Sequence, residues 1–222
     1  MEQPSIFFWG VEIQEPVTSL TDILVGIACI YAFVLLNKKG RPEKPFRYFR
    51  WFFITTGVAT IMAGFLGHAF YYAAETWLKA PGWIISMLGV MFIERGSIAH
   101  AEPLLNSKFV RFFKAINVVE LLIFMGLTFY FMDFRFVQLH TFYGLVVVVF
   151  AFEGYVLYKT GQKEIWWILG SIISMVFCAT VYLTKLALHP FFNHADLAHI
   201  FMLISVILAY QGISRLKIIE NQ

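Results

Sequence analysis

The feature of this sequence that most limits its fold is a series of seven long apolar runs separated by short polar connections. Each run has about the 20 residues that a helix needs to cross a hydrocarbon core about 30 Å thick. The runs lie at 20–37, 48–72, 82–101, 109–132, 137–158, 165–188 and 195–215. We therefore expect residues 1–222 to form one all-α domain, a seven-transmembrane-helix bundle in a multi-pass integral membrane protein.

The composition agrees with a bilayer environment. Hydrophobic residues make up 59% of the chain and charged residues only 14%, against about a quarter in typical soluble domains. The excess of apolar side chains must therefore face lipid. The basic residues do not gather in the kind of patch that binds nucleic acid, so no nucleic-acid partner is expected.

The distribution of Lys and Arg over the connections predicts the orientation. Thirteen basic residues follow the first, third, fifth or seventh run: Lys38, Lys39, Arg41, Lys44, Arg47, Arg50, Lys108, Arg111, Lys114, Lys159, Lys163, Arg215 and Lys217. Three lie at the opposite ends, namely Lys79, Arg135 and Lys185. Because cytoplasmic loops are enriched in Lys and Arg, we expect the N-terminus outside and the C-terminus in the cytoplasm.

Most of the histidines fall on the predicted outer side. They are His68, His140, His189, His194 and His199, and the carboxylates Asp22, Glu75 and Asp196 lie on the same side. Ionisable groups at membrane depth are costly, so they usually face the interior of the bundle and mark function. This predicts a functional site near the outer ends of the helices.

The spacing of these residues indicates a metal site. Asp196 and His199 are three residues apart and share a helical face, and His68 and Glu75, seven apart, do the same. His194 lies roughly 140° around a helix from His199, so it joins them only if the helix begins after it. Imidazole and carboxylate ligands from two helices suit Zn²⁺, which keeps one position open for water in catalytic sites. Candidate ligands are therefore His68, His199, Asp196 and His194, with Asp196 as a ligand or a general base.

Simpler roles remain open for several of these residues. Asp196 can act as the N-terminal cap of the seventh helix, where a carboxylate is favourable without any metal. His140 and His189 can be hydrogen-bonded tethers at the membrane interface. The sequence does not decide between these roles and metal binding.

Polar and small residues also occur inside the apolar runs. Arg95 is expected to pair with Glu120 or Glu153, because an unpaired buried charge is unfavourable. Three glycines of the second helix predict close packing against a neighbouring helix: Gly57, Gly64 and Gly67.

The pattern resembles the CREST superfamily of seven-helix membrane hydrolases, which includes the alkaline ceramidases. The resemblance rests on the helix count, the orientation, His68 in the second helix and the histidine motif that opens the seventh. The stretch from Trp9 to Glu15, followed by Asp22, is similar to the acidic segment with which alkaline ceramidases bind Ca²⁺. The resemblance implies zinc ligands at His68 and His199, and calcium ligands at Glu12, Glu15 and Asp22.

The sequence departs from the CREST pattern in three helices. Gly64 stands where the family has a Ser in the second helix, and Ala195 stands where it has the first His of the seventh. The third run contains no Asp. By this resemblance, Asp196 or His194 would replace a metal ligand, and Ser86 or Glu75 would supply the missing polar catalytic group.

These features predict a zinc-dependent hydrolase that cleaves an amide or ester bond of a membrane lipid near the outer leaflet. A b-type cytochrome is an alternative, because His68, His140 and His199 could supply two axial haem ligands. A non-enzymatic receptor or transporter is a third possibility. The oligomeric state is not predicted.

Overall fold

The computed structural model describes residues 3–73 and 76–219. Within them, seven helical segments are long and apolar enough to cross a membrane: Pro16–Lys38, Lys44–Ala69, Trp77–Leu104, Ser107–Phe131, Arg135–Thr160, Ile165–Thr184 and His194–Ile213. Each coincides with one of the seven apolar runs. The all-α architecture expected from the sequence is therefore confirmed.

Several of these seven segments, here called spans one to seven in chain order, are built from more than one helical element. The elements in chain order are α1 (Pro16–Lys38), α2 (Lys44–Met62), η1 (Ala63–Ala69), α3 (Thr76–Ala101), η2 (Glu102–Leu104), α4 (Ser107–Phe131), α5 (Arg135–Phe142), η3 (Tyr143–Val149), α6 (Phe150–Thr160), α7 (Ile165–Thr184) and α8 (His194–Ile213). η1 and η3 are π-helical, so spans two and five each contain a wider turn. π-helical turns often occur at functional sites.

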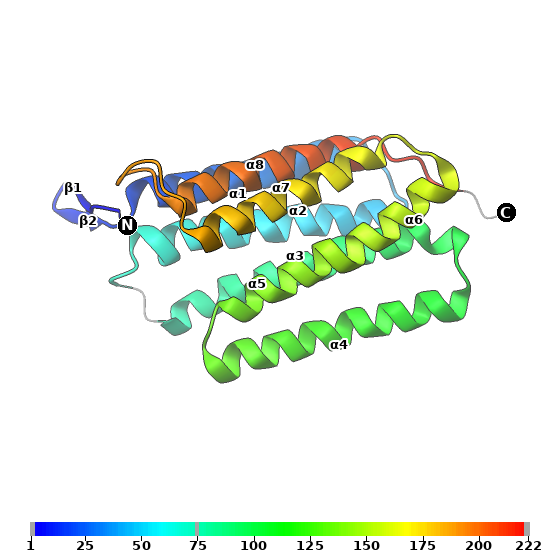
Figure 1. Cartoon of the computed structure of the whole chain (residues 1–222), viewed down its shortest axis with the longest axis horizontal. Helices are drawn as coiled ribbons and strands as arrows, with labels where there is room; N and C mark the ends of the chain where they lie inside the picture. The colour runs from blue at the N-terminus through cyan, green and yellow to red at the C-terminus, as the bar shows by residue number, and fades with distance from the viewer. Residues whose placement is uncertain (1–2, 74–75, 220–222) are drawn as a thin grey trace.

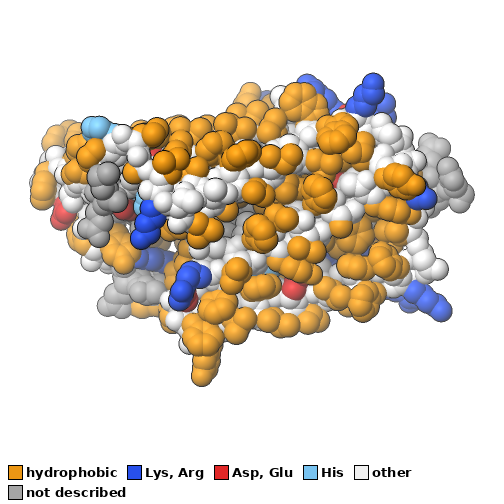
Figure 2. Space-filling view, viewed as in Figure 1, with side chains coloured by type: hydrophobic (Ala, Val, Ile, Leu, Met, Phe, Trp, Pro, Cys, Tyr) orange, Lys and Arg blue, Asp and Glu red, His pale blue; other side chains and the backbone are white. Residues whose placement is uncertain are grey.

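The helices run side by side along the long axis of the molecule (Figure 1). α1 packs against α2 and α8, α7 packs against α8, and α4 lies at the edge of the bundle against α3 and α5. On the face drawn in Figure 2, hydrophobic side chains cover the middle, and most Lys and Arg side chains lie near the two ends. This distribution is the one that a membrane-spanning bundle requires.

A short hairpin precedes α1 and was not predicted from the sequence. β1 (Ile6–Phe8) pairs antiparallel with β2 (Val11–Ile13). The two residues between the strands, Trp9 and Gly10, have φ angles of 49° and 79°, as in the tight hairpin turns that favour glycine. Strands of three residues are too short for hydropathy alternation to reveal.

Glycines allow α1 and α2 to approach closely. A Cβ atom on Gly57 would lie 2.9 Å from Ile30 and 3.0 Å from the carbonyl oxygen of Gly26. A Cβ atom on Gly64 would lie 2.9 Å from the carbonyl oxygen of Ser19. Gly67 differs, because its nearest neighbour is Ala63 of its own helix. The close packing predicted for Gly57 and Gly64 is thus present, while Gly67 takes no part in it.

The structure corrects the expected pairing of Arg95. Its Nε donates to Oδ1 of Asn117 at 2.5 Å, and its Nη2 donates to the carbonyl oxygen of Lys114 at 2.5 Å. Glu153 instead accepts from His100 at 2.9 Å. Arg95 is thus bonded to a side-chain amide and a backbone carbonyl rather than to a carboxylate. The spacing of residues in the sequence does not reveal which kind of acceptor an arginine will meet.

Candidate metal centre

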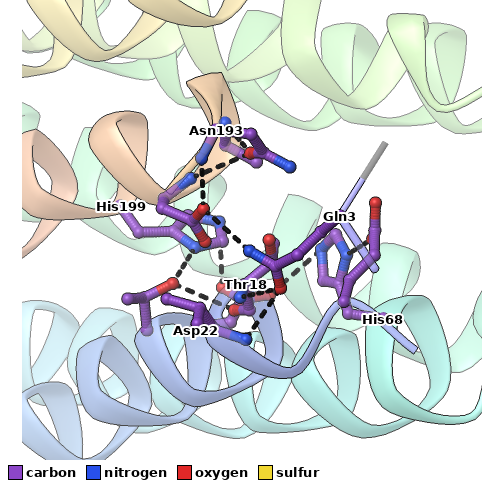
Figure 3. Close-up of polar contacts among 11 residues, drawn as sticks. Gln3, Thr18, Asp22, His68, Asn193 and His199 are labelled. Carbon is purple, nitrogen blue, oxygen red and sulfur yellow. Dashed lines mark hydrogen bonds and ion pairs between the residues drawn. The ribbon is translucent and has the colours of Figure 1, made fainter. Parts of the chain in front are cut away.

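Three ionisable side chains from three elements meet near the N-terminal end of α1. Asp22 of α1, His68 of η1 and His199 of α8 each offer a ligand atom, and these atoms lie within 4.8 Å of one another. Nε2 of His68 is 3.8 Å from Oδ2 of Asp22, and Nε2 of His199 is 3.5 Å from Oδ1 of Asp22. The dashed lines in Figure 3 mark contacts among these labelled residues. The predicted association of His68 with His199 is present, and their ring centroids are 6.1 Å apart.

The Nδ1 atom of each imidazole, which points away from Asp22, has its own hydrogen-bond partner. Nδ1 of His68 lies 2.6 Å from Oε2 of Glu15, and Nδ1 of His199 lies 2.8 Å from Oγ1 of Thr21. Histidines that bind metals usually donate the far ring N–H to such a partner, which fixes the tautomer. The arrangement of both histidines follows this rule.

The hydrogen-bond network assigns the protons. The hydrogen bond with His68 lowers the pKa of the Glu15 carboxyl, so this group is ionised and can only accept. The Thr21 hydroxyl donates to the carbonyl oxygen of Thr18, which leaves it to accept from His199. In the neutral form of each imidazole, Nδ1 therefore carries the proton and the Nε2 lone pair faces the side chain of Asp22.

This assignment leaves three electron-pair donors facing one another. When both imidazoles are neutral and Asp22 is ionised, no proton lies between the two Nε2 atoms and the carboxylate, so their negative charges repel. A cation placed between them would turn this repulsion into attraction. Two imidazoles and one carboxylate are a donor set that suits Zn²⁺, with a fourth position left for water or substrate.

Local structure holds each member of the group in place. Gly64 permits α1 to approach η1, which brings Asp22 next to His68. Gln3 connects the starts of α1 and α8, because its Oε1 accepts from the backbone N–H of Val17 and its Nε2 donates to Asp196. The side chain of Asp22 is only 5% exposed and that of His68 is 24% exposed. The site is therefore most accessible on the side of His68.

Asp196 has the capping role rather than a place in the metal group. Its Oδ2 accepts the backbone N–H of Asn193 at 2.6 Å, while the Asn193 side chain accepts the N–H groups of Ala195 and Asp196. These reciprocal bonds form a capping box at the start of α8. In the group that could hold a metal ion, the carboxylate beside His68 and His199 belongs to Asp22 and not to Asp196, as had been expected.

The other predicted histidines lie apart from Asp22. His194 is the first residue of α8, and its ring faces Tyr182 with a centroid distance of 5.3 Å. His189 lies in the connection before α8, where its Nδ1 accepts from the backbone N–H of Phe191. His140 is buried beside Glu94 and Glu120 in a different part of the bundle.

The remaining predicted site residues are dispersed. Ser86 lies half-buried on α3, a helix that packs against η1. Glu12 lies on β2 opposite Phe7. Among the described residues, the possible metal groups include Asp22 but neither Glu12 nor Glu15, so the three proposed calcium ligands do not converge. Glu75 lies outside the described residues.

Asp22 was not predicted as a partner of the histidines, and neither Thr21 nor Gln3 was predicted to belong to the site. Asp22 carried one usable signal, because it is a lone carboxylate within an apolar run, at about the depth of His199. Thr21 and Gln3 have ordinary polar side chains with no distinctive spacing. Their roles depend on contacts between distant segments.

A model described as a family of unknown function, DUF6962, matches residues 17–218. No curated protein and no solved structure matches the chain.

Proposed function

We infer the function from the site itself, because the chain belongs to a family of unknown function, DUF6962. We propose that the protein is a zinc-dependent hydrolase that cleaves an amide or ester bond of a membrane lipid. The observation that carries this proposal is the convergence of the Nε2 atoms of His68 and His199 with the carboxylate of Asp22. The similarity to CREST hydrolases supports the same reaction class.

Each residue of the site has a role in this proposal. Zinc lowers the pKa of a bound water to about 7 and polarises a carbonyl group. His68, His199 and Asp22 would hold the ion, while Glu15 and Thr21 fix the orientation of the imidazoles. Asp22 would also be the carboxylate able to accept a proton from the attacking water.

The position of Asp22 favours a metal ion over haem. Its two carboxylate oxygens lie between the Nε2 atoms of His68 and His199, at 3.8 and 3.5 Å. A bis-histidine haem needs that space for the porphyrin plane, and an anionic group there is unnecessary for axial ligation. A receptor or transporter has no comparable observation in its favour.

The proposal places the site at the outer membrane surface. The hairpin beside the start of α1 exposes Phe7, Phe8 and Trp9, the last of them 92% exposed. Aromatic side chains concentrate where a bilayer meets water. At the other end of the bundle, Lys39 and Arg41 donate to carbonyl oxygens just after α8, where the excess of basic residues indicates the cytoplasm.

This orientation predicts the location of both termini. A tag before Met1 should be accessible to an impermeant reagent on intact cells, and a reporter after Gln222 should be active only in the cytoplasm. The physical reason is that thirteen basic residues lie at the proposed cytoplasmic ends of the helices and only three at the opposite ends. Detection of both termini on one side of the membrane would contradict the proposed seven-span topology.

Metal removal tests the proposed reaction directly. The purified protein should contain zinc and hydrolyse amide-linked or ester-linked lipids, and a chelator should abolish turnover. Readdition of Zn²⁺ should restore it, because the ion activates the attacking water. Turnover that survives complete zinc removal would refute the mechanism, and a haem absorption band from a zinc-free preparation would favour the cytochrome.

A further inference from the structure

A second group of ligand-type side chains lies between α3, α4 and α5. Glu94 of α3, Glu120 of α4 and His140 of α5 each place one ligand atom within 4.8 Å of the others. Their exposed fractions are 0%, 7% and 0%. This group shares no residue with the site formed by α1, η1 and α8, and the proposed hydrolysis does not use it.

Most polar atoms of this inner group are unsatisfied. Among the described residues, Oε1 of Glu94, both carboxylate oxygens of Glu120 and both ring nitrogens of His140 lack a hydrogen-bond partner. An unsatisfied buried polar atom costs about 1–3 kcal/mol, and more when it is charged. Apolar side chains of Met87, Leu121 and Val137 pack between the same three helices. The group therefore needs a ligand that satisfies several of these atoms at once.

Arg95 does not serve as that ligand. Oε2 of Glu94 accepts from Nδ2 of Asn117 at 2.6 Å, and the opposite side of the same amide accepts from Arg95. The guanidinium therefore reaches the inner group only through Asn117. A divalent cation bound here would displace any proton shared by the two carboxyl groups, and the resulting charge of about −2 on the two carboxylates would be neutralised by that single ion.

We propose that Glu94, Glu120 and His140 bind a divalent metal ion of the Mn²⁺, Fe²⁺ and Zn²⁺ class. Carboxylates suit harder ions such as Mn²⁺, and imidazole suits Fe²⁺ and Zn²⁺, so a mixed set selects this class over Mg²⁺ or Ca²⁺. Such an ion ties α4, at the edge of the bundle (Figure 1), to α3 and α5.

The backbone beside this group leaves room for the ligands. Gly144 lies in η3, directly after α5. A Cβ atom there would overlap Oε1 of Glu94 and Cγ1 of Val90. Gly144→Ala is therefore expected to displace the Glu94 carboxylate and weaken metal binding without removing any ligand.

The stoichiometry of Co²⁺ binding tests the proposal. The purified protein is stripped with a chelator and titrated with Co²⁺, followed by equilibrium dialysis and by the visible absorption of the bound ion. The wild type should bind two ions per chain, one at each site. His68→Ala combined with His199→Ala should retain the inner ion. Glu120→Gln combined with His140→Gln should retain the ion at the site of Asp22, His68 and His199. The affinity of the inner site should fall by more than about a hundredfold, because loss of a group that merely hydrogen-bonds to a metal ligand already costs about 10–100-fold in affinity.

Glu153→Gln provides a matched control. Glu153 is also a buried carboxylate of span five, and it is bonded to His100 outside the group. This variant should bind two ions. Circular dichroism and size-exclusion chromatography establish that each variant is folded.

Two results would overturn the inner site. They are a folded His68→Ala, His199→Ala protein that binds no Co²⁺, or a folded Glu120→Gln, His140→Gln protein that still binds two ions. The first variant leaves the inner group intact, so the test stands even if the second does not fold. Failure of the proposed hydrolase centre gives a different pattern, in which the wild type binds one ion that only the inner substitutions remove.

Discussion

Asp22→Ala should remove most of the zinc from the outer site and lower lipid hydrolysis by about a thousandfold. The reason is that Asp22 supplies the only anionic ligand of the group among the described residues. Loss of a metal ion that stabilises transition-state charge by several kcal/mol corresponds to a rate loss of this order. His68→Ala should have the same effect. Zinc content by elemental analysis and turnover of a lipid substrate measure the two effects together.

Two variants separate ligand loss from general damage. His189→Ala alters a histidine of the connection before α8 and should leave both zinc and turnover unchanged. Asp196→Ala removes the capping box of α8, so it should lower the free energy of unfolding by about 1 kcal/mol while zinc is retained. If Asp196→Ala loses zinc and Asp22→Ala keeps it, the assignment of the third ligand is wrong.

Gly57→Leu should strongly destabilise the bundle. The first added carbon alone would lie 2.9 Å from Ile30, 3.0 Å from the carbonyl oxygen of Gly26 and 3.1 Å from Cys29. The backbone of α1 cannot give way as a flexible side chain can, so α1 and α2 must separate. Overpacking of this kind typically costs about 1–3 kcal/mol, and sometimes more. Thermal unfolding in detergent measures the loss.

Gly126→Leu is the matched control. Gly126 lies in α4, and a Cβ atom there would meet nothing within 4 Å. The same change should therefore leave stability unchanged, or raise it slightly through a better helix propensity. Equal destabilisation by both substitutions would show that the close approach of α1 and α2 is not the cause.

The seven spans could be predicted from the sequence because hydropathy and charge are local properties. The run at 109–132, for example, coincides with α4 within two residues. A span is defined by its own length and composition. No knowledge of its neighbours is required.

Only some of the residues that form the candidate site could be predicted from the sequence. His68 and His199 were proposed because ionisable groups at membrane depth are costly and usually face the interior of the bundle. Asp196 was ambiguous, since an acidic residue near the start of a helix suits both a cap and a ligand. The structure distinguishes them through Asn193, whose backbone N–H binds the Asp196 carboxylate. Asp22 lies beside His68 and His199 because α1 packs against η1 and α8, and the sequence does not show this packing.

The sequence shows that Glu120 lies inside an apolar run, but it gives no sign that the three residues of the inner group meet. Glu94, Glu120 and His140 are separated by 26 and 20 residues, and they lie on three different spans. Their proximity depends on how α3, α4 and α5 are rotated about their axes. The rotation of each helix about its axis is fixed by its packing against the other helices. No simple spacing of residues in the sequence reveals that packing.

The π-helical segment η1 gives the two halves of span two different rotations about the helix axis. Gly57 faces α1 from the regular helix α2, and His68 faces Asp22 from η1. A π-helix turns the chain less per residue than an α-helix, so if residues 63–69 formed an ordinary α-helix, His68 would be rotated by roughly 100° away from Asp22. Such a change of helix type would not alter the hydropathy of the span. Two relatives with the same membrane profile can therefore differ in whether they possess this site at all, and the type of helix in the second half of span two is the property that distinguishes them.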